Sequence, residues 1–266
     1  MRNTRAGTFM LQPMTRRSAF AMLAAGAVVA ACNENPVTGR SQLVLVDDAM
    51  LAQLGEQAWR DALSKMPRTQ SPALQTRLER IGARIVDASG RTNENWEFAV
   101  FDSPEVNAFV LPGGKVAFYS GLMELAGGDG EIAAVMGHEV GHVEARHAAE
   151  RMSQQLLVQL GVQAASLVLS EEYGANAGAI AGALGMGVMY GVVLPYSRKH
   201  ELEADALGVK LMRDAAYDPG DAVRFWEKMV ASNGQRPKAL EWLSTHPADD
   251  TRLVELRRAA AAPAPG

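Results

Sequence analysis

The 266-residue sequence predicts an α+β domain in which helices predominate. Residues 47–63 and 71–88 repeat apolar residues at helical spacing. Residues 96–102 and 107–121 instead have the alternating pattern typical of short strands. From Asp129 onward, helical patterns continue almost to the end of the chain. We therefore expect a small β-sheet beside a larger helical part.

Composition and charge narrow the class of protein. Hydrophobic residues make up 48% of the chain and charged residues 21%, as in ordinary folded proteins. The formal charge is -4, but the first 31 residues hold four arginines and no acid. The remaining 22 basic and 30 acidic residues leave that part at -8. A nucleic-acid partner is therefore not expected.

Residues 1–31 have the features of an export signal of the lipoprotein type. Basic residues up to Arg17 precede the uncharged run "SAFAMLAAGAVVAAC", which is too short to span a bilayer. The run ends at Cys32, the only cysteine, in a context that resembles the lipobox of bacterial lipoproteins. We expect a lipid anchor on Cys32 and, because Asn33 follows it, a periplasm-facing location at the outer membrane, with the inner membrane as the alternative. Residues 32–46 are predicted to be a polar linker.

The main domain is predicted over residues 47–260, with a frayed tail at 261–266. Asp47 or Asp48 caps the first helix, and Ser71 with Pro72 caps the second. The strand-like residues 107–121 are interrupted by "PGG", which indicates a hairpin or a kinked edge strand. Further helices are expected within residues 128–155, 156–169, 198–215, 218–231 and 247–262.

The run from Ala175 to Leu194 is uncharged over twenty residues, the length of a membrane span. Its glycines and alanines also suit a tightly packed helical hairpin. A single crossing would place chemistry-bearing residues before and after it on opposite sides of a membrane. We therefore expect the hairpin, and contact of residues 156–194 with lipid stays open.

The segment "AVMGHEVGHVEARH" contains the pattern His138-Glu139-x-x-His142. Residues four apart on a helix lie about 40° from alignment, so both imidazoles can bind one ion. Glu139 lies about 60° beyond His142 and can take a proton from a metal-bound water without being a ligand. The preceding turns are apolar, which favours a buried site over a solvated helix. His147 falls about 180° from His138 on a continuous helix and is predicted to be a non-ligand.

A catalytic zinc needs a third protein ligand, and "SRKHELEADALG" supplies candidates. Glu201 and Asp205 are four residues apart and share a helix face, with Gly208 permitting close packing one turn on. Glu201 suits a ligand, and Asp205 suits an acceptor for a ligand imidazole. His200 and Glu203 are the competing candidates, and both point elsewhere if Glu201 faces the metal.

The segments "NAFVLPGG", "HEVGH", "SRKHELEAD" and "STHP", in this order, resemble the zinc metallopeptidase family that contains HtpX, BepA and the CAAX prenyl proteases. The "NPVTGR" run at residues 35–40 is similar to its periplasmic lipoprotein members. The resemblance covers about Asn35 to Arg258 and implies a zincin-like fold with a small sheet beside the His-Glu-x-x-His helix. The sequence departs from the family pattern in two respects. The chain ends before a BepA-like repeat domain, and it lacks clear HtpX-like membrane spans.

The resemblance implies one zinc ion bound by His138, His142 and Glu201, with Glu139 as general base. It also implies that Asp205 contacts a ligand residue rather than the zinc. It also places His246 beside the zinc, as a fourth ligand or an electrophile, whereas the sequence alone leaves it as a loop residue or a site residue. Substrate backbone is implied to add as a strand along the segment that contains Asn107, Ala108, Phe109, Pro112, Gly113 and Gly114.

These inferences predict a zinc endopeptidase that cleaves misfolded or unassembled envelope proteins. The alternative is a chaperone-like outer-membrane assembly factor whose zinc site is closed or latent. The peptidase is favoured because Glu139 has no structural duty in a closed site. The expected partners are unfolded envelope proteins, the membrane through Cys32, and outer-membrane assembly machinery.

Overall fold

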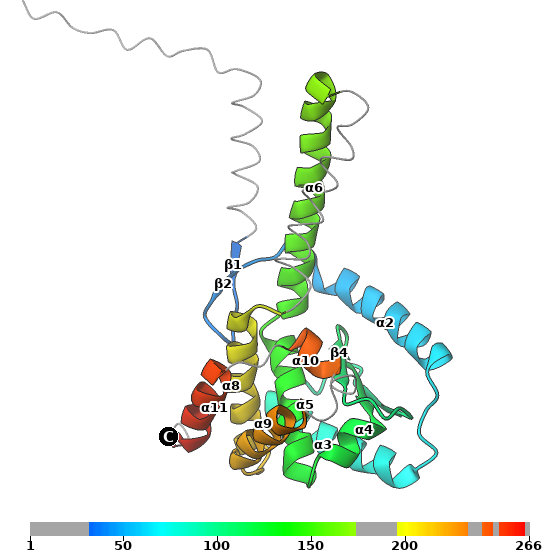
Figure 1. The fold of residues 1–266 in the computed structure, drawn as a ribbon, viewed down its shortest axis with the longest axis vertical. Helices are drawn as coiled ribbons and strands as arrows, with labels where there is room; N and C mark the ends of the chain where they lie inside the picture. The colour runs from blue at the N-terminus through cyan, green and yellow to red at the C-terminus, as the bar shows by residue number, and fades with distance from the viewer. Residues whose placement is uncertain (1–31, 174–195, 234–240, 247–249, 264–266) are drawn as a thin grey trace, which may run out of the picture.

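A computed structural model describes residues 32–173, 196–233, 241–246 and 250–263 (Figure 1). The predicted signal segment 1–31 and the uncharged run Ala175–Leu194 lie outside the described residues. The elements in chain order are β1 (Cys32–Glu34), β2 (Ser41–Leu43), α2 (Asp48–Lys65), α3 (Pro72–Ser89), β3 (Glu97–Phe101), β4 (Ala108–Leu111), β5 (Lys115–Tyr119), α4 (Ser120–Leu125), α5 (Asp129–Glu144), α6 (His147–Tyr173), α8 (Arg198–Asp214), α9 (Gly220–Asn233), α10 (Glu241–Thr245) and α11 (Asp250–Ala261).

The predicted fold class is confirmed, because helices enclose a small three-stranded sheet of order β3-β5-β4. β3 pairs with β5 in parallel, and β4 pairs with β5 in antiparallel fashion. β4 and β5 form the predicted hairpin, in which Gly113 and Gly114 have φ values of 85° and 78°. Glycine has no Cβ to resist this left-handed region, which explains why two glycines form the turn.

The sheet contributes side chains to two apolar clusters because neighbouring residues of a strand point to opposite faces. Val116 and Phe118 of β5 join the main core, which also contains Ile81 of α3 and Met136 of α5. Ala117, between them, joins a smaller cluster. Trp59 of α2 joins the smaller cluster, and its indole nitrogen donates to Glu97 at 2.9 Å. The sheet thus lies between α2 on one face and α3 with α5 on the other.

α5 and α8 approach closely at glycines, as expected for Gly208. A Cβ atom at Gly208 would lie 2.8 Å from the backbone nitrogen of His138. A Cβ atom at Gly141 would lie 2.8 Å from the backbone oxygen of Ala204. Real Cβ atoms do not approach backbone so closely, so the helix separation depends on these glycines. The two helices carry the metal-ligand candidates, and their close contact brings those residues together.

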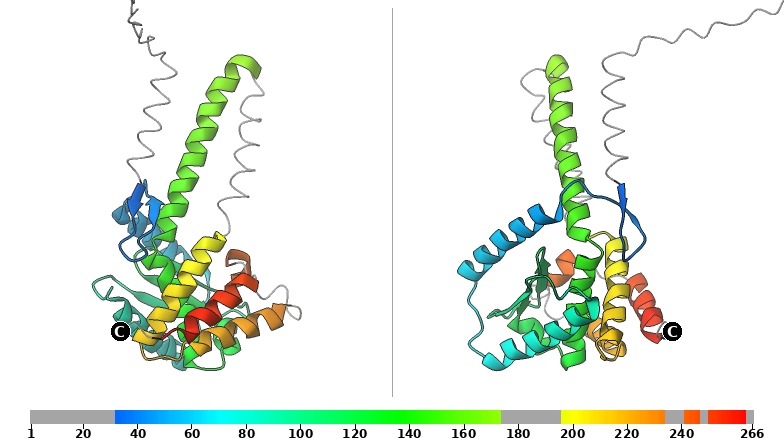
Figure 2. Two further views of the ribbon diagram at one scale, coloured as in Figure 1. Left: turned by 90° about the vertical axis from the view of Figure 1, so that its left-hand side faces the viewer. Right: turned by 180° about the vertical axis from the view of Figure 1, so that it is seen from behind.

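Two sequence predictions differ from the structure. The helix expected over residues 128–155 ends at Glu144, and Arg146 adopts a φ of 54° before α6 begins at His147. α6 then continues through the predicted break at residue 156 and extends beyond the rest of the described elements (Figures 1 and 2). Residues 32–46, expected to be a linker, instead contain the antiparallel pair β1–β2 packed against α6.

Of residues 156–194, the structure describes the backbone up to Tyr173, within α6. Within the part of the chain that the structure describes, no helix has both the length and the apolar character needed to cross a bilayer.

Candidate metal centre

Four side chains from three parts of the chain converge in the interior. His138 and His142 come from α5, Glu201 comes from α8, and His246 follows α10. The Nε2 atoms of His138 and His142 are 3.0 Å apart, and His246 Nδ1 lies 3.1 Å from His138 Nε2. The Glu201 carboxylate lies 3.5 Å from His138 Nε2 and 3.4 Å from His142 Nε2. One donor atom from each residue therefore faces a common point, with all four atoms within 4.8 Å of one another.

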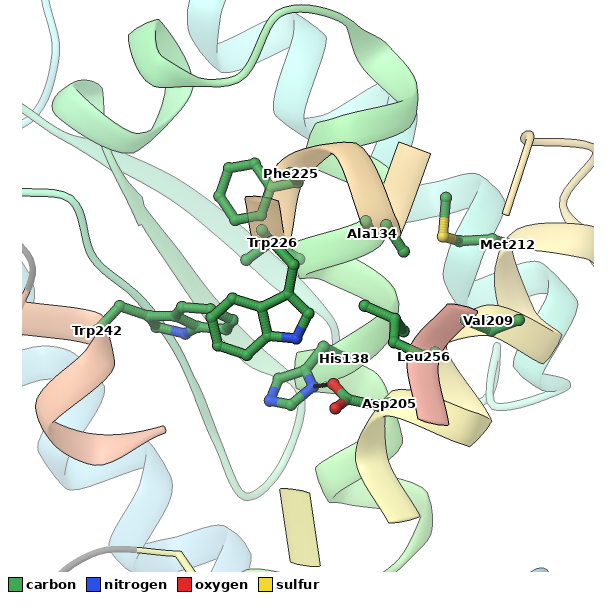
Figure 3. A pocket seen from close by; sticks show the side chains of 12 residues that line it. Ala134, His138, Asp205, Val209, Met212, Phe225, Trp226, Trp242 and Leu256 are labelled. Carbon is green, nitrogen blue, oxygen red and sulfur yellow. Dashed lines mark hydrogen bonds and ion pairs between the residues drawn. The ribbon is translucent and has the colours of Figure 1, made fainter. Parts of the chain in front are cut away.

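A second set of charged groups forms hydrogen bonds and ion pairs with these metal-ligand candidates. Asp205 Oδ1 accepts from His138 Nδ1 at 2.8 Å, and this pair is drawn in Figure 3. Arg252 of α11 donates to both oxygens of Asp205 at 2.8 Å and contacts Glu201 at 2.5 Å. Its guanidinium also lies over the ring of Trp226, 4.3 Å from the centroid. The fixed fork of Arg252 thus binds two carboxylates that α8 presents on one face.

The pKa values of these groups depend on burial and on their partners. Burial lowers the pKa of His138, but hydrogen bonds to Asp205 and Glu201 outweigh it and raise the pKa to about 9. Burial lowers the pKa of His142 well below its usual value. Burial opposes ionisation of Glu201, but its interactions with the surrounding imidazoles, His138 first, hold its pKa well below the usual range. Glu201 is therefore a carboxylate ready to bind a cation.

Glu139 follows His138 on α5 and is 2% exposed. Its Oε1 accepts a hydrogen bond of 2.9 Å from the indole nitrogen of Trp242 in α10, and His246 Nε2 lies 3.6 Å from the same oxygen. The carboxylate therefore lies beside the four donor atoms without belonging to their set. Such a position suits proton transfer rather than metal binding.

Aromatic rings enclose the centre on two sides. The His246 ring stacks between Trp242, at a centroid distance of 4.8 Å, and Tyr196, at 5.2 Å. Tyr196 also covers His142 at 4.0 Å. On the side of His138, Phe225, Trp226 and Trp242 form the wall of a small apolar cavity in Figure 3. These rings exclude water from the donor atoms and strengthen electrostatic interactions there.

The other two histidines, His147 and His200, do not belong to the four-donor group and pair with carboxylates beside it. His147 Nε2 lies 2.9 Å from Glu203, and His200 Nε2 lies 3.2 Å from Glu150. The sequence predicted a continuous helix from His138 to His147, but the helix is not continuous, and the break at Arg146 turns His147 back toward the centre. Its Nδ1 lies 2.8 Å from Nδ1 of His142. Burial lowers the pKa of His147 to about 4, so this imidazole is neutral near pH 7.

The segment implied for substrate binding borders the centre. Asn107 precedes β4, Ala108 and Phe109 lie in it, and Pro112, Gly113 and Gly114 form the hairpin turn. Among the described residues β4 pairs only with β5, so its other edge has no strand partner there. A pocket of about 80 Å³ lies between this hairpin, α2 and the metal centre. Its lining includes Leu51, Val110, Pro112, Gly113, His142, Val143, Arg146 and Tyr196.

Sequence reasoning missed Arg252, Trp242 and Tyr196. Arg252 lies six residues after His246, in a segment interpreted only as a helix with basic and acidic residues. Trp242 lies in a short helix without a periodic signal. The one available signal was proximity: Tyr196 directly precedes "SRKHELEAD", and Trp242 precedes "STHP".

Comparison with protein families matches residues 72–260 to Peptidase family M48. The chain is 34% identical over 224 residues to the mitochondrial metalloendopeptidase OMA1 of Schizosaccharomyces pombe, which covers 83% of this chain and 64% of that protein. It is 32% identical over 248 residues to OMA1 of Saccharomyces cerevisiae, covering 84% and 67%. It is 28% identical over 215 residues to the Beta-barrel assembly-enhancing protease of Escherichia coli, covering 78% and 43%.

These names correct one prediction. The expected lipid-anchored location at the bacterial outer membrane is wrong, because several similar proteins are named as mitochondrial. That location was inferred from residues 1–33, which precede the family match at residues 72–260. The chain also spans less than two thirds of the length of most of the relatives described, including 64% of the protein from Schizosaccharomyces pombe and 43% of the one from Escherichia coli.

Proposed function

The chain belongs to peptidase family M48, and from that premise we propose that it is a metallopeptidase that hydrolyses peptide bonds with zinc bound by His138, His142 and Glu201. One observation carries the proposal: a buried set of imidazole and carboxylate donors lies beside a carboxylate, Glu139, that does not belong to the set. This arrangement has the ligands of a catalytic zinc site and a separate proton acceptor.

The donor spacing fits zinc. Bonds of about 2.0–2.1 Å in a tetrahedron place neighbouring ligand atoms about 3.3 Å apart. The two Nε2 atoms are 3.0 Å apart, and the Glu201 carboxylate approaches His138 Nε2 to 3.5 Å through Oε2 and His142 Nε2 to 3.4 Å through Oε1. His246 Nδ1 is 3.1 Å from both His138 Nε2 and Glu201 Oε1, which supports His246 as a fourth ligand.

Each residue around the site has a separate role in the proposed reaction. Zinc in this site would act as a Lewis acid that polarises the scissile carbonyl and acidifies water. Glu139 accepts the proton of the attacking water and returns it to the leaving amine. The indole of Trp242 holds the Glu139 carboxylate in place at 2.9 Å. Asp205 orients the His138 imidazole, and Arg252 holds Asp205 in turn.

We propose that the substrate is an extended peptide segment. β4 offers an edge to which a strand can add by backbone hydrogen bonds, and such pairing selects extended chains rather than folded ones. The pocket beside His142 contains the apolar side chains of Leu51, Val110 and Val143. It suits an apolar side chain of the peptide near the cleaved bond.

Segments of this kind are exposed by unfolded and unassembled proteins, which we propose as the substrate class. The narrower class, misfolded or unassembled cell-envelope proteins, is supported by the name of the Escherichia coli relative, Beta-barrel assembly-enhancing protease. The mitochondrial names of other relatives favour the broader class. Envelope proteins are therefore one set of substrates to compare with unfolded proteins in general.

Substitution Glu139→Gln tests the proposal. The amide keeps the shape and the contact with Trp242 but accepts no proton, so zinc should be retained while cleavage of unfolded casein is lost. General base removal lowers rates by about 10²–10⁴-fold. Metal content by mass spectrometry and cleavage by gel assay measure the two effects. Cleavage by Glu139→Gln at the wild-type rate would contradict the assigned role.

A closed site in a chaperone-like assembly factor is the second candidate. The observation that favours it is burial, since Glu201 is 0% exposed and His246 is stacked between two aromatic rings. His246 at the fourth corner would exclude water from the metal. A wild-type protein that binds zinc and unfolded proteins but cleaves none under zinc-replete conditions would support this candidate over the peptidase.

A further inference from the structure

Residues 32–46 contact charged groups beside the metal centre, Glu203 and Glu150, through the turn between β1 and β2. We call residues 35–42 the N-terminal hairpin. Arg40 of this hairpin donates to Glu203 of α8 at 3.0 Å, and its terminal nitrogens donate to Glu150 of α6 at 2.9 and 2.5 Å. The side chains of Arg40, Glu203 and Glu150 are only 13%, 15% and 10% exposed. These ion pairs are therefore largely removed from solvent and oriented by several hydrogen bonds.

The same hairpin caps the C-terminal end of α5. The last carbonyls of a helix lack partners within it and need donors from elsewhere. The side-chain amide of Asn35 donates to Glu144 O at 3.1 Å, and the amide of Gln42 donates to Ala145 O at 2.5 Å. Arg146 follows with its φ of 54°, and the chain turns so that His147 faces inward. The hairpin thus fixes the break that creates the position of His147.

A chain of hydrogen bonds connects Arg40 to a metal-ligand candidate. Glu203 Oε2 accepts from His147 Nε2 at 2.9 Å. Because the His147 proton is then on Nε2, its Nδ1 carries a lone pair and accepts from His142 Nδ1, 2.8 Å away. The proton of His142 is thereby held on Nδ1. Its Nε2 lone pair remains free and points to the four-donor cluster, 3.0 Å from His138 Nε2.

We propose that the N-terminal hairpin is a positioning element of the metal centre, which acts through Arg40, Glu203 and His147 to fix the ring orientation and tautomer of His142. The arrangement parallels Arg252–Asp205–His138 on the other ligand imidazole. Partners that orient ligand imidazoles typically change metal affinity by about 10–100-fold when they are removed. The inference rests on the proposed function in that His142 is taken as a zinc ligand.

Zinc affinity tests the inference through a residue remote from the ion. We expect Arg40→Met to lower zinc affinity by about 10-fold or more, measured by competition with a chelator. Arg77→Met is the control, because it also removes an arginine–carboxylate pair, the more exposed one with Asp129, 2.7 Å long, which belongs to neither the four-donor cluster nor the Arg40 contacts. Arg40→Lys retains the charge but loses the fork, so a smaller loss is expected and covers the case in which Arg40→Met fails to fold. Equal zinc affinity in the Arg40 variants and Arg77→Met would overturn the inference.

Substitutions at His147 separate orientation from general packing. His147→Phe fills the space but accepts no hydrogen bond, so it should weaken zinc binding by about 10-fold or more. In His147→Asn the side-chain oxygen takes the place of Nδ1, which should restore most of the affinity. Adding Arg40→Met to His147→Phe should cause little further loss, because both act through one path. Full additivity of the two losses, or equal affinity of the Phe and Asn variants, would overturn the inference.

The tautomer of His142 gives a reading that does not need zinc. In the metal-free protein, nitrogen-15 NMR of the histidine rings should show the His142 proton on Nδ1 in the wild type, and a mixture of tautomers in His147→Phe. A wild-type proton on Nε2 would overturn the inference. If the wild type binds no zinc but shows the Nδ1 tautomer, the proposed function fails and the positioning of His142 stands.

Discussion

Replacing Arg252 with methionine should be among the most destabilising single changes in the described part of the chain. Its guanidinium is 1% exposed and contacts Asp205 and Glu201, which are 7% and 0% exposed. Methionine retains the apolar stem against Trp226 but leaves two buried carboxylates without this cation. Removal of one partner of a buried ion pair costs about 3–5 kcal/mol. For a domain of this size, that lowers the Tm by about 6–20 °C, at about 2–4 °C per kcal/mol.

Bound zinc should reduce this loss but not remove it, because the ion then compensates the charge of Glu201, while Asp205 keeps only its hydrogen bond with His138. Urea unfolding with a chelator and with excess zinc measures both values. Arg257→Met on the same helix is the control: its pair with Glu227 joins side chains that are 56% and 47% exposed and is worth about 0–1 kcal/mol. Equal losses in the Arg252 and Arg257 variants would refute the structural role assigned to Arg252.

Three further predictions follow from the same geometry. His246→Ala should raise peptidase activity if His246 closes the fourth position, or abolish it if His246 stabilises developing charge; unchanged activity and zinc affinity would contradict both roles. Burial opposes ionisation of Glu150, but hydrogen bonds from His200 and Arg40 hold its pKa below the usual 4.5. The ionised Glu150 therefore stabilises the folded state above about pH 4.5, and this stabilisation is lost as the pH falls through the folded-state pKa. Urea midpoints of wild type and Glu150→Gln should therefore converge in acid, and a constant difference would contradict this. Gly208→Val should destabilise the fold by about 1–3 kcal/mol and also weaken zinc binding, because its Cβ would lie 2.8 Å from the backbone of α5. Calorimetry measures the first effect and chelator competition the second. A Gly208→Val variant with wild-type zinc affinity would refute the dependence of the zinc site on the helix separation.

The sequence was informative where the structure depends on local periodicity. α3 begins at Pro72 after a Ser71 cap, as its sequence predicts, and β4–β5 turns at Gly113 and Gly114. The pattern His138-Glu139-x-x-His142 places its three side chains on a helix, where spacing alone decides which of them share a face. The family resemblance is likewise confirmed by the match over residues 72–260.

The sequence was uninformative where structure depends on contacts between distant segments. Nothing local marks Arg146 as a helix break, because arginine resists a positive φ and the apolar pattern continues past it. The break depends on Asn35 and Gln42, more than 100 residues earlier, which bind the carbonyls at the end of α5. The "NPVTGR" run therefore forms a turn whose polar side chains bind the domain, whereas the sequence predicted a linker.

The distance between α5 and α8 connects the local pattern to the chemistry. Two imidazoles on one helix fix only two corners of a coordination tetrahedron, and the third corner depends on how closely the second helix packs. Gly141 faces Ala204, and Gly208 faces His138, so that backbone meets backbone at the level of the ligand residues. Larger side chains there would hold the Glu201 carboxylate too far from the two Nε2 atoms, which it now approaches to 3.5 and 3.4 Å. The glycines are thus as necessary to the proposed zinc site as the side chains that would bind the ion, although no ligand-spacing motif contains Gly208.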